Sequence, residues 1–270
     1  MDPRPAVRPE LHRTVHPGGP LRFVLVHGSM DRQGGFARLT KHLRPDGEVV
    51  TYDRRGYGRS RAVGETFEIA DHVDDLLSVI DQVPSIVVGH SLGGVIALAA
   101  AGRRPDLMRG VVVFEVPMSW EPWWPTDSGG SVAASMSDRP EDAAEEFMRR
   151  VVGSQRWDRL PERTRLERRS EGPALVGEMT SIRRGRPWNP AEILCPIVSG
   201  HGRGSRPQFE RSAHTIGETV GDAIVVALPD ARHNAHSDMP EKFKRALIEP
   251  MLERLRSGSF VGGPGVTGPA

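Results

Sequence analysis

The stretch that decides the fold is GHSLGG, residues 89–94, which stands between the apolar runs SIVV (85–88) and VIALAAAG (95–102). The first run has the length and the Val/Ile content of a buried strand, and the second reads as a helix. A serine at a sharp strand-to-helix turn exposes its hydroxyl at the edge of a sheet, and flanking glycines leave room for the backbone. The stretch therefore predicts that Ser91 is a nucleophile; the alternative is a Gly-Ser turn that merely ends a strand.

The rest of the chain alternates between strand-like and helix-like segments. Short runs rich in Val and Ile predict strands at 22–26 (RFVLV), 48–52 (EVVTY), 85–88 (SIVV), 110–114 (GVVVF), 196–199 (PIVS) and 223–228 (AIVVAL). Apolar residues recur at helical spacing in 67–82 and 241–254, and segment 91–103 consists mostly of small apolar residues, so we expect helices in all three. Pro250 should kink or divide the helix at 241–254. This order predicts an α/β fold with a doubly wound, mostly parallel sheet.

One region, 117–190, breaks the alternation. It contains no convincing strand, starts with a Pro-rich stretch, and continues with charged helical segments at 141–152, 160–170 and 173–184. We expect a helical cap inserted after the strand that ends near Phe114, on a core formed by 1–116 and 191–256. The Gly/Pro-rich segment 257–270 is predicted to be a disordered tail.

Composition excludes several classes of function. The chain has 270 residues with 36 Lys+Arg against 35 Asp+Glu, so its formal charge of +1 gives no support for a nucleic-acid or membrane partner. The single cysteine, Cys195, excludes an internal disulfide and a Cys-based metal cluster, and we expect it to pack in the core. No apolar run is long enough to span a membrane and the first residues do not resemble a secretory signal, so a cytoplasmic location is expected.

Four segments, in this order, resemble the α/β-hydrolase family: VLVHGS (24–29), YDRRGYGRS (52–60), GHSLGG (89–94) and RHNAHSDMPEKF (232–243). The resemblance covers nearly the whole core and implies a serine hydrolase that needs no cofactor and no metal. It also implies an oxyanion hole made by the backbone N–H groups of Leu92 and Ser29, with Met30 as the alternative to Ser29. Epoxide hydrolases and dehalogenases of this fold use an Asp nucleophile, so Ser91 argues against both.

The late segment offers two histidines, His233 and His236. The resemblance implies that His233, the first of the pair, is the general base and that His236 supports it. Two alternatives stay open: His236 could be the base, or the H-x-x-H pair could bind a metal, although a third ligand is not obvious and a serine nucleophile needs no metal.

The acid departs from the family pattern. The family usually carries it after the penultimate strand, but here the loop 200–205 reads GHGRGS and has no Asp or Glu. Some relatives place the acid after the strand that follows the nucleophile helix, and in this chain that residue is Glu115. We therefore predict Glu115 as the acid that orients His233. The alternatives are that Glu115 caps the next segment or pairs with an arginine, or that a Ser–His dyad works without an acid.

Aromatic residues open the predicted cap. Trp120, Trp123 and Trp124, together with Met30, are expected to form an apolar pocket wall, unless the tryptophans only join the cap to the core. An apolar pocket favours a small hydrophobic ester, lactone or thioester. The predicted activity is hydrolysis of an ester or lactone; thioesterases, acyltransferases and carbon–carbon bond hydrolases share the same residues. Because the acid is missing from its usual loop, a non-catalytic ligand-binding protein with the same fold stays open as an alternative to an enzyme.

Overall fold

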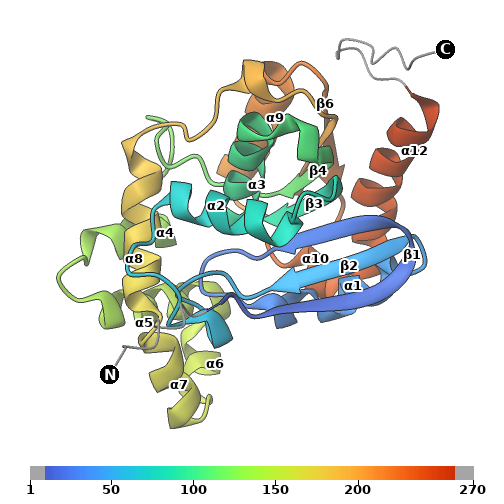
Figure 1. The fold of residues 1–270 in the computed structure, drawn as a ribbon. Coiled ribbons are helices and arrows are strands. Elements are labelled where there is room, and N and C mark those ends of the chain that lie inside the picture. The colour runs from blue at the N-terminus through green and yellow to red at the C-terminus, as the bar shows by residue number, and fades with distance from the viewer. Residues whose placement is uncertain (1–9, 259–270) are drawn as a thin grey trace, which may run out of the picture.

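A six-stranded sheet with the strand order β2-β1-β3-β4-β5-β6 forms the centre of the computed structural model, which describes residues 10–258 (Figure 1). The strands are β1 (Arg13–Val26), β2 (Gly47–Tyr52), β3 (Ser85–His90), β4 (Met108–Phe114), β5 (Ile197–Gly202) and β6 (Ala223–Leu228). The pairs from β1–β3 through β5–β6 are all parallel. The predicted mostly parallel α/β sheet is therefore confirmed.

Strand β1 is longer than predicted because its first part is a polar segment that pairs antiparallel with β2. Arg13 lies opposite Tyr52 and His16 opposite Val49, and β1 then bends around β2 (Figure 1). This first part contains prolines and glycines and has no apolar run, so the sequence did not indicate a strand there.

Both faces of the sheet are covered by helices, and this explains why the strands read as unbroken apolar runs. In β4, Val111 and Val113 belong to one buried cluster, whereas Val112 and Phe114 belong to the other. Helices α2 (Ile69–Ile80), α3 (Leu92–Arg103) and α9 (Pro207–Thr219) contribute to the first cluster, and α1 (Ala37–Leu43), α10 (Ala235–Asp238), α11 (Pro240–Phe243) and α12 (Glu249–Ser257) contribute to the second. Successive side chains of a strand point to opposite faces, so each residue meets a helical layer.

The last predicted helix, 241–254, is divided as expected. It consists of α11, a π-helical turn at Lys244–Ile248, and α12. Pro250 is the second residue of α12, directly after the π-helical turn; because proline has no N–H, it cannot donate the hydrogen bond that would continue a regular helix through this point. Ser257 ends α12, and residues 259–270 of the predicted disordered tail lie outside the described residues.

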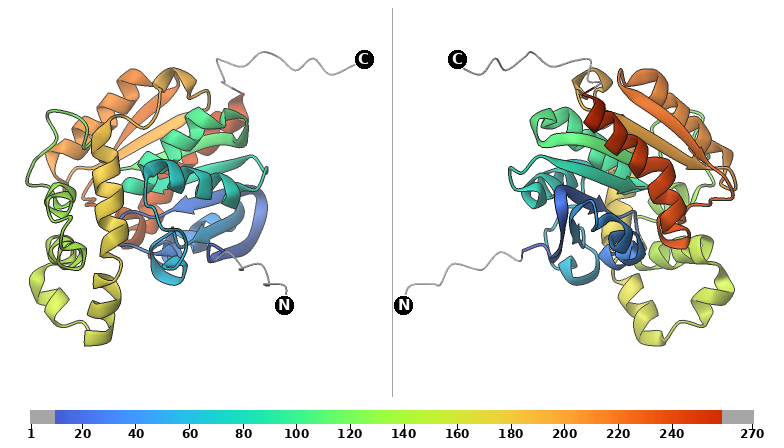
Figure 2. Two further views of the ribbon diagram at one scale, coloured as in Figure 1. Left: turned by 60° about the vertical axis from the view of Figure 1, so that its left-hand side comes forward. Right: turned by 90° about the vertical axis from the view of Figure 1, so that its right-hand side faces the viewer.

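A helical insertion follows β4, as predicted. It comprises α4 (Gly129–Ser135), α5 (Pro140–Val152), α6 (Ser154–Asp158), α7 (Glu162–Arg169) and α8 (Gly172–Ser181), which gather at one end of the molecule (Figure 2). The short helices α4 and α6 were not predicted, because five to seven residues carry too little periodicity. Within residues 10–258, none of the helices combines the length and the apolar content needed to cross a membrane.

Candidate active site

Ser91 occupies a strained turn between β3 and α3. Its backbone angles are φ 53° and ψ −124°, a conformation that costs a non-glycine residue about 1–3 kcal/mol. Two hydrogen bonds hold it: the Ser91 N–H donates to the Phe114 carbonyl at 2.9 Å, and the Gly94 N–H donates to the Ser91 carbonyl at 2.8 Å. Glycine is required at position 93, because a Cβ there would lie 2.0 Å from the Val26 carbonyl oxygen. The turn packs the start of α3 directly against β1 and leaves Ser91 in the wall of a cavity.

Glu115 follows β4 and is also held in a positive-φ conformation, with φ 54°. Its side chain is buried, and its Oε2 accepts a hydrogen bond of 2.6 Å from Nδ1 of His233 in the loop after β6. Its Oε1 accepts from the Gly202 N–H at 2.9 Å, and its own N–H donates to the Gly200 carbonyl at 2.9 Å. The loop that carries no acid in this chain therefore supplies the backbone groups that hold Glu115. With the proton on Nδ1, the Nε2 atom of His233 is left as the basic nitrogen.

His233 is fixed from two further sides. Its ring stacks on Phe209 of α9 with a centroid distance of 4.9 Å. Its backbone carbonyl accepts a hydrogen bond of 2.8 Å from Nε2 of His90, the residue directly before Ser91. The side chain remains 31% exposed. His90 thus ties the loop of His233 to the strand that carries Ser91, while the His233 ring still faces the cavity.

The loop after β1 is anchored by Arg54. The Arg54 guanidinium donates to the carbonyls of His27 at 2.9 Å and Gly28 at 3.2 Å, and His27 Nδ1 also donates to Gly28 at 2.8 Å. Burial lowers the pKa of His27 well below its ordinary value, so the ring is neutral and its Nε2 accepts the Arg54 N–H. In a trans peptide the C=O and the following N–H point in opposite directions. The Ser29 N–H is therefore directed away from Arg54.

Arg54 also connects this loop to the cap. Its Nη1 donates to Oε2 of Glu178 in α8 at 2.9 Å, and the Tyr57 hydroxyl donates to Oε1 at 2.6 Å. Burial alone would raise the pKa of Glu178, but the charge of Arg54 and the contact with His72 outweigh it and lower the pKa to about 2. No sequence pattern marks Glu178 as a buried residue, so it was not predicted, and Arg54 and Tyr57 were identified only as members of the motif YDRRGYGRS.

Two cavities meet at Ser29, Ser91 and His233. One, of about 230 Å³, has an apolar wall formed by Trp124, Phe147, Val151, Met179 and Phe209. The other, of about 330 Å³, shares Phe147 and Val151 with the first and is also lined by Met30, Met148, Val152, Leu160 and several polar residues.

The predicted aromatic wall is therefore only partly present. Trp124 lines the first cavity, but neither Trp120 nor Trp123 lines either of the two. Trp120 packs edge-on against Trp188 at 5.1 Å, and Trp123 lies under the Arg211 guanidinium at 4.4 Å. These two tryptophans join the cap entry to neighbouring segments.

Known proteins resemble this chain over most of its length. The sequence profile of the alpha/beta hydrolase family matches residues 23–246. A pimeloyl-[acyl-carrier protein] methyl ester esterase of Chromobacterium violaceum is 27% identical over 242 residues, which cover 84% of this chain and 92% of that protein. Haloalkane dehalogenase 2 of Mycobacterium tuberculosis is 26% identical over 273 residues, covering 90% and 91%. A thermophilic esterase from Thermogutta terrifontis has a similar fold, with a TM-score of 0.73 at 18% identity over 93% of this chain and 96% of that one.

Proposed function

This chain belongs to the alpha/beta hydrolase family, and on that premise we propose that it hydrolyses a carboxylic ester or lactone through an acyl-enzyme on Ser91. The observation that carries the proposal is the 2.6 Å hydrogen bond between Glu115 and Nδ1 of His233, beside a cavity that Ser91 also lines. A buried carboxylate on one imidazole nitrogen is the arrangement that prepares the other nitrogen for general base catalysis.

In the proposed mechanism, the Ser91 hydroxyl attacks the ester carbonyl while Nε2 of His233 accepts its proton. Glu115 stabilises the imidazolium that forms. The N–H groups of Leu92 and Ser29 bind the oxyanion; the Leu92 N–H has no intrahelical partner because Leu92 is the first residue of α3. His233 then protonates the leaving alcohol, and a water activated by the same nitrogen releases the acid and regenerates Ser91.

The apolar cavity supports a hydrophobic group on the substrate. The bacterial relative is named for a methyl ester, which agrees with an ester substrate for this chain. Ser91 argues against the chemistry of the dehalogenase relative, because that reaction in this fold uses an Asp nucleophile. A thioester, acyl transfer to an alcohol, or carbon–carbon bond cleavage would use the same residues.

The test compares Glu115→Gln with the matched control Glu210→Gln, an exposed glutamate on α9. With p-nitrophenyl butyrate we expect Glu115→Gln to lower kcat by about 10³–10⁴-fold, because Gln cannot stabilise the imidazolium, and Glu210→Gln to leave it unchanged. A fluorophosphonate probe should label the wild-type chain but not Ser91→Ala. Unchanged turnover in Glu115→Gln would remove Glu115 from the mechanism, and failure to label the folded wild-type chain would favour a non-catalytic binding protein.

A further inference from the structure

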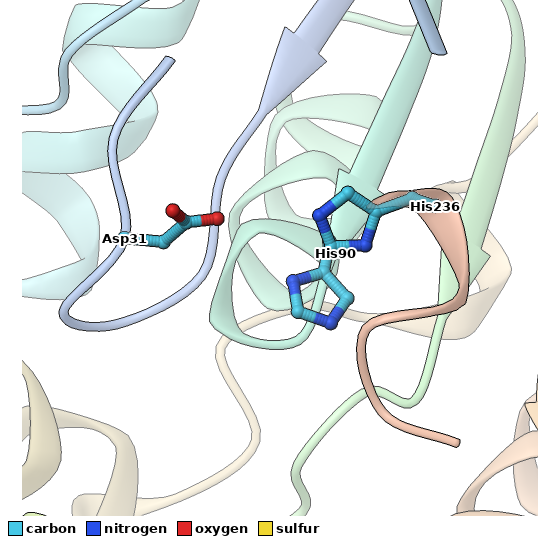
Figure 3. Close-up of side chains that lie close together, drawn as sticks. All are labelled: Asp31, His90 and His236. Carbon is cyan, nitrogen blue, oxygen red and sulfur yellow. The ribbon is translucent and has the colours of Figure 1, made fainter. Parts of the chain in front are cut away.

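A second group of ligand-forming side chains lies next to Ser91. The side chains of Asp31, His90 and His236 each offer one oxygen or nitrogen atom, and these three atoms all lie within 4.8 Å of one another. They come from three distant parts of the chain: the loop after β1, the end of β3, and α10 (Figure 3). In the close-up the Asp31 carboxylate is directed toward the two imidazole rings.

The two histidines have nitrogen atoms that the protein leaves without a partner. Nε2 of His90 donates to the His233 carbonyl, which leaves a lone pair on Nδ1; this atom is buried and has no hydrogen-bond partner among residues 10–258. Nδ1 of His236, also buried, has no partner in the same part of the chain. A buried polar atom without a partner costs about 1–3 kcal/mol. A ligand between these side chains would remove part of that cost.

We propose that Asp31, His90 and His236 form a binding site for a divalent transition-metal ion such as Zn²⁺. Two imidazoles and one carboxylate make a nitrogen-and-oxygen donor set that suits Zn²⁺ better than Mg²⁺ or Ca²⁺. The hydrogen bond from His90 to a backbone carbonyl is the type of contact that orients histidine ligands of metals. His233, which binds Glu115, is not part of this site, so the H-x-x-H segment divides between two roles.

The surroundings leave room for the ion. All three side chains line the cavity of about 330 Å³, so a fourth coordination position would face that cavity and take a water molecule. Residue 35 is a glycine, and a Cβ at this position would lie 2.5 Å from the Asp31 carboxylate, so the missing side chain leaves space beside that carboxylate. Arg168 lines the same cavity, but its charge is paired with Glu171 at 3.2 Å.

Ion binding requires a small closure. A tetrahedral Zn²⁺ with bonds of about 2.0–2.1 Å holds its ligand atoms about 3.3 Å apart. The three atoms must therefore approach one another by at most about 1.5 Å from the spacing of up to 4.8 Å. The Asp31 side chain comes from a loop, and its rotation would bring the carboxylate closer to the two rings.

The test measures binding of Zn²⁺ and Co²⁺ to the metal-free full chain, made without a polyhistidine tag, by titration calorimetry and by the visible absorption of bound Co²⁺. We expect one ion per chain, and at least about tenfold weaker Zn²⁺ binding in Asp31→Asn and in His236→Gln. His214→Ala is the matched control, because His201, Glu210 and His214 form a similar group, in which Glu210 and His214 are exposed. It should bind Zn²⁺ at the Asp31 site like the wild type.

The proposal is overturned if the wild type binds no Zn²⁺, if Asp31→Asn binds it as tightly as the wild type, or if His214→Ala alone abolishes binding. Asn has nearly the shape of Asp, so Asp31→Asn decides the question even if His236→Gln does not fold. Ion binding does not depend on chemistry at Ser91, so this result is separate from the fluorophosphonate and ester experiments.

Discussion

Replacing Glu178 with Gln should strongly destabilise the protein, because it leaves the Arg54 charge buried without its counter-charge. Both side chains are fully buried, and their closest atoms lie 2.9 Å apart. Gln keeps the shape of the side chain, but it replaces one of the two oxygens that accept from Arg54 and Tyr57 with an NH2 group, so the change removes the charge and one accepted hydrogen bond.

Three considerations set the size of the effect. Removing one partner of a buried ion pair costs about 3–5 kcal/mol. Opposite charges about 4 Å apart attract by about 4 kcal/mol at an effective dielectric constant of about 20. The lowering of the Glu178 pKa from 4.5 to about 2 corresponds to about 3 kcal/mol of preference for the charged form. We therefore expect the free energy of unfolding to fall by about 3–5 kcal/mol.

Urea unfolding at pH 7.5, followed by circular dichroism, measures this difference. The control is Glu167→Gln, another cap glutamate, whose side chain is 38% exposed and which pairs with Arg163 at 3.1 Å and, at 3.9 Å, with Arg32. These surface pairs should contribute about 1 kcal/mol or less each. Suppose that Glu178→Gln lowers the free energy of unfolding no more than Glu167→Gln, with an unchanged dependence on urea concentration. The Arg54 charge would then not depend on Glu178, and Arg54 and Glu178 would not anchor the cap.

Two further outcomes follow from the buried histidines and the cavity wall. Burial lowers the pKa values of His27 and His72 in the folded protein. The stabilisation that comes from their neutral forms is therefore complete above the pKa of about 6.5 in the unfolded chain, and it is lost as the pH falls below that value. The unfolding free energy should therefore drop by at least about 1.4 kcal/mol between pH 7.5 and 5.5; a flat profile in urea titrations would mean that the folded protein takes up these protons. Because Trp124 lines the apolar cavity and Trp123 does not, Trp124→Ala should shift the preference among p-nitrophenyl esters toward longer acyl chains, whereas Trp123→Ala should not. Equal shifts in both variants would refute this division of roles.

The features that the sequence predicted correctly are those that depend on interactions between residues close together in the chain. The unbroken apolar runs indicated strands buried on both faces, and GHSLGG indicated the turn at Ser91, because strand propensity and turn chemistry depend on neighbouring residues. The first part of β1 was not predicted, because it is a strand only through its antiparallel pairing with β2, which is distant in the sequence.

The sequence showed that the loop 200–205 has no carboxylate, and the resemblance to the family then pointed to Glu115 as the candidate acid. Only the tertiary structure brings Glu115 within 2.6 Å of His233, 118 residues away, and uses the Gly202 N–H to hold it. It likewise pairs Arg54 with Glu178 across 124 residues and places Trp124, but not Trp123, in the cavity wall. The sequence determined which side chains were available and which strands could form. Which charges become buried together, and which aromatic ring lines a cavity, was decided by packing between distant segments, and no local pattern encodes that packing.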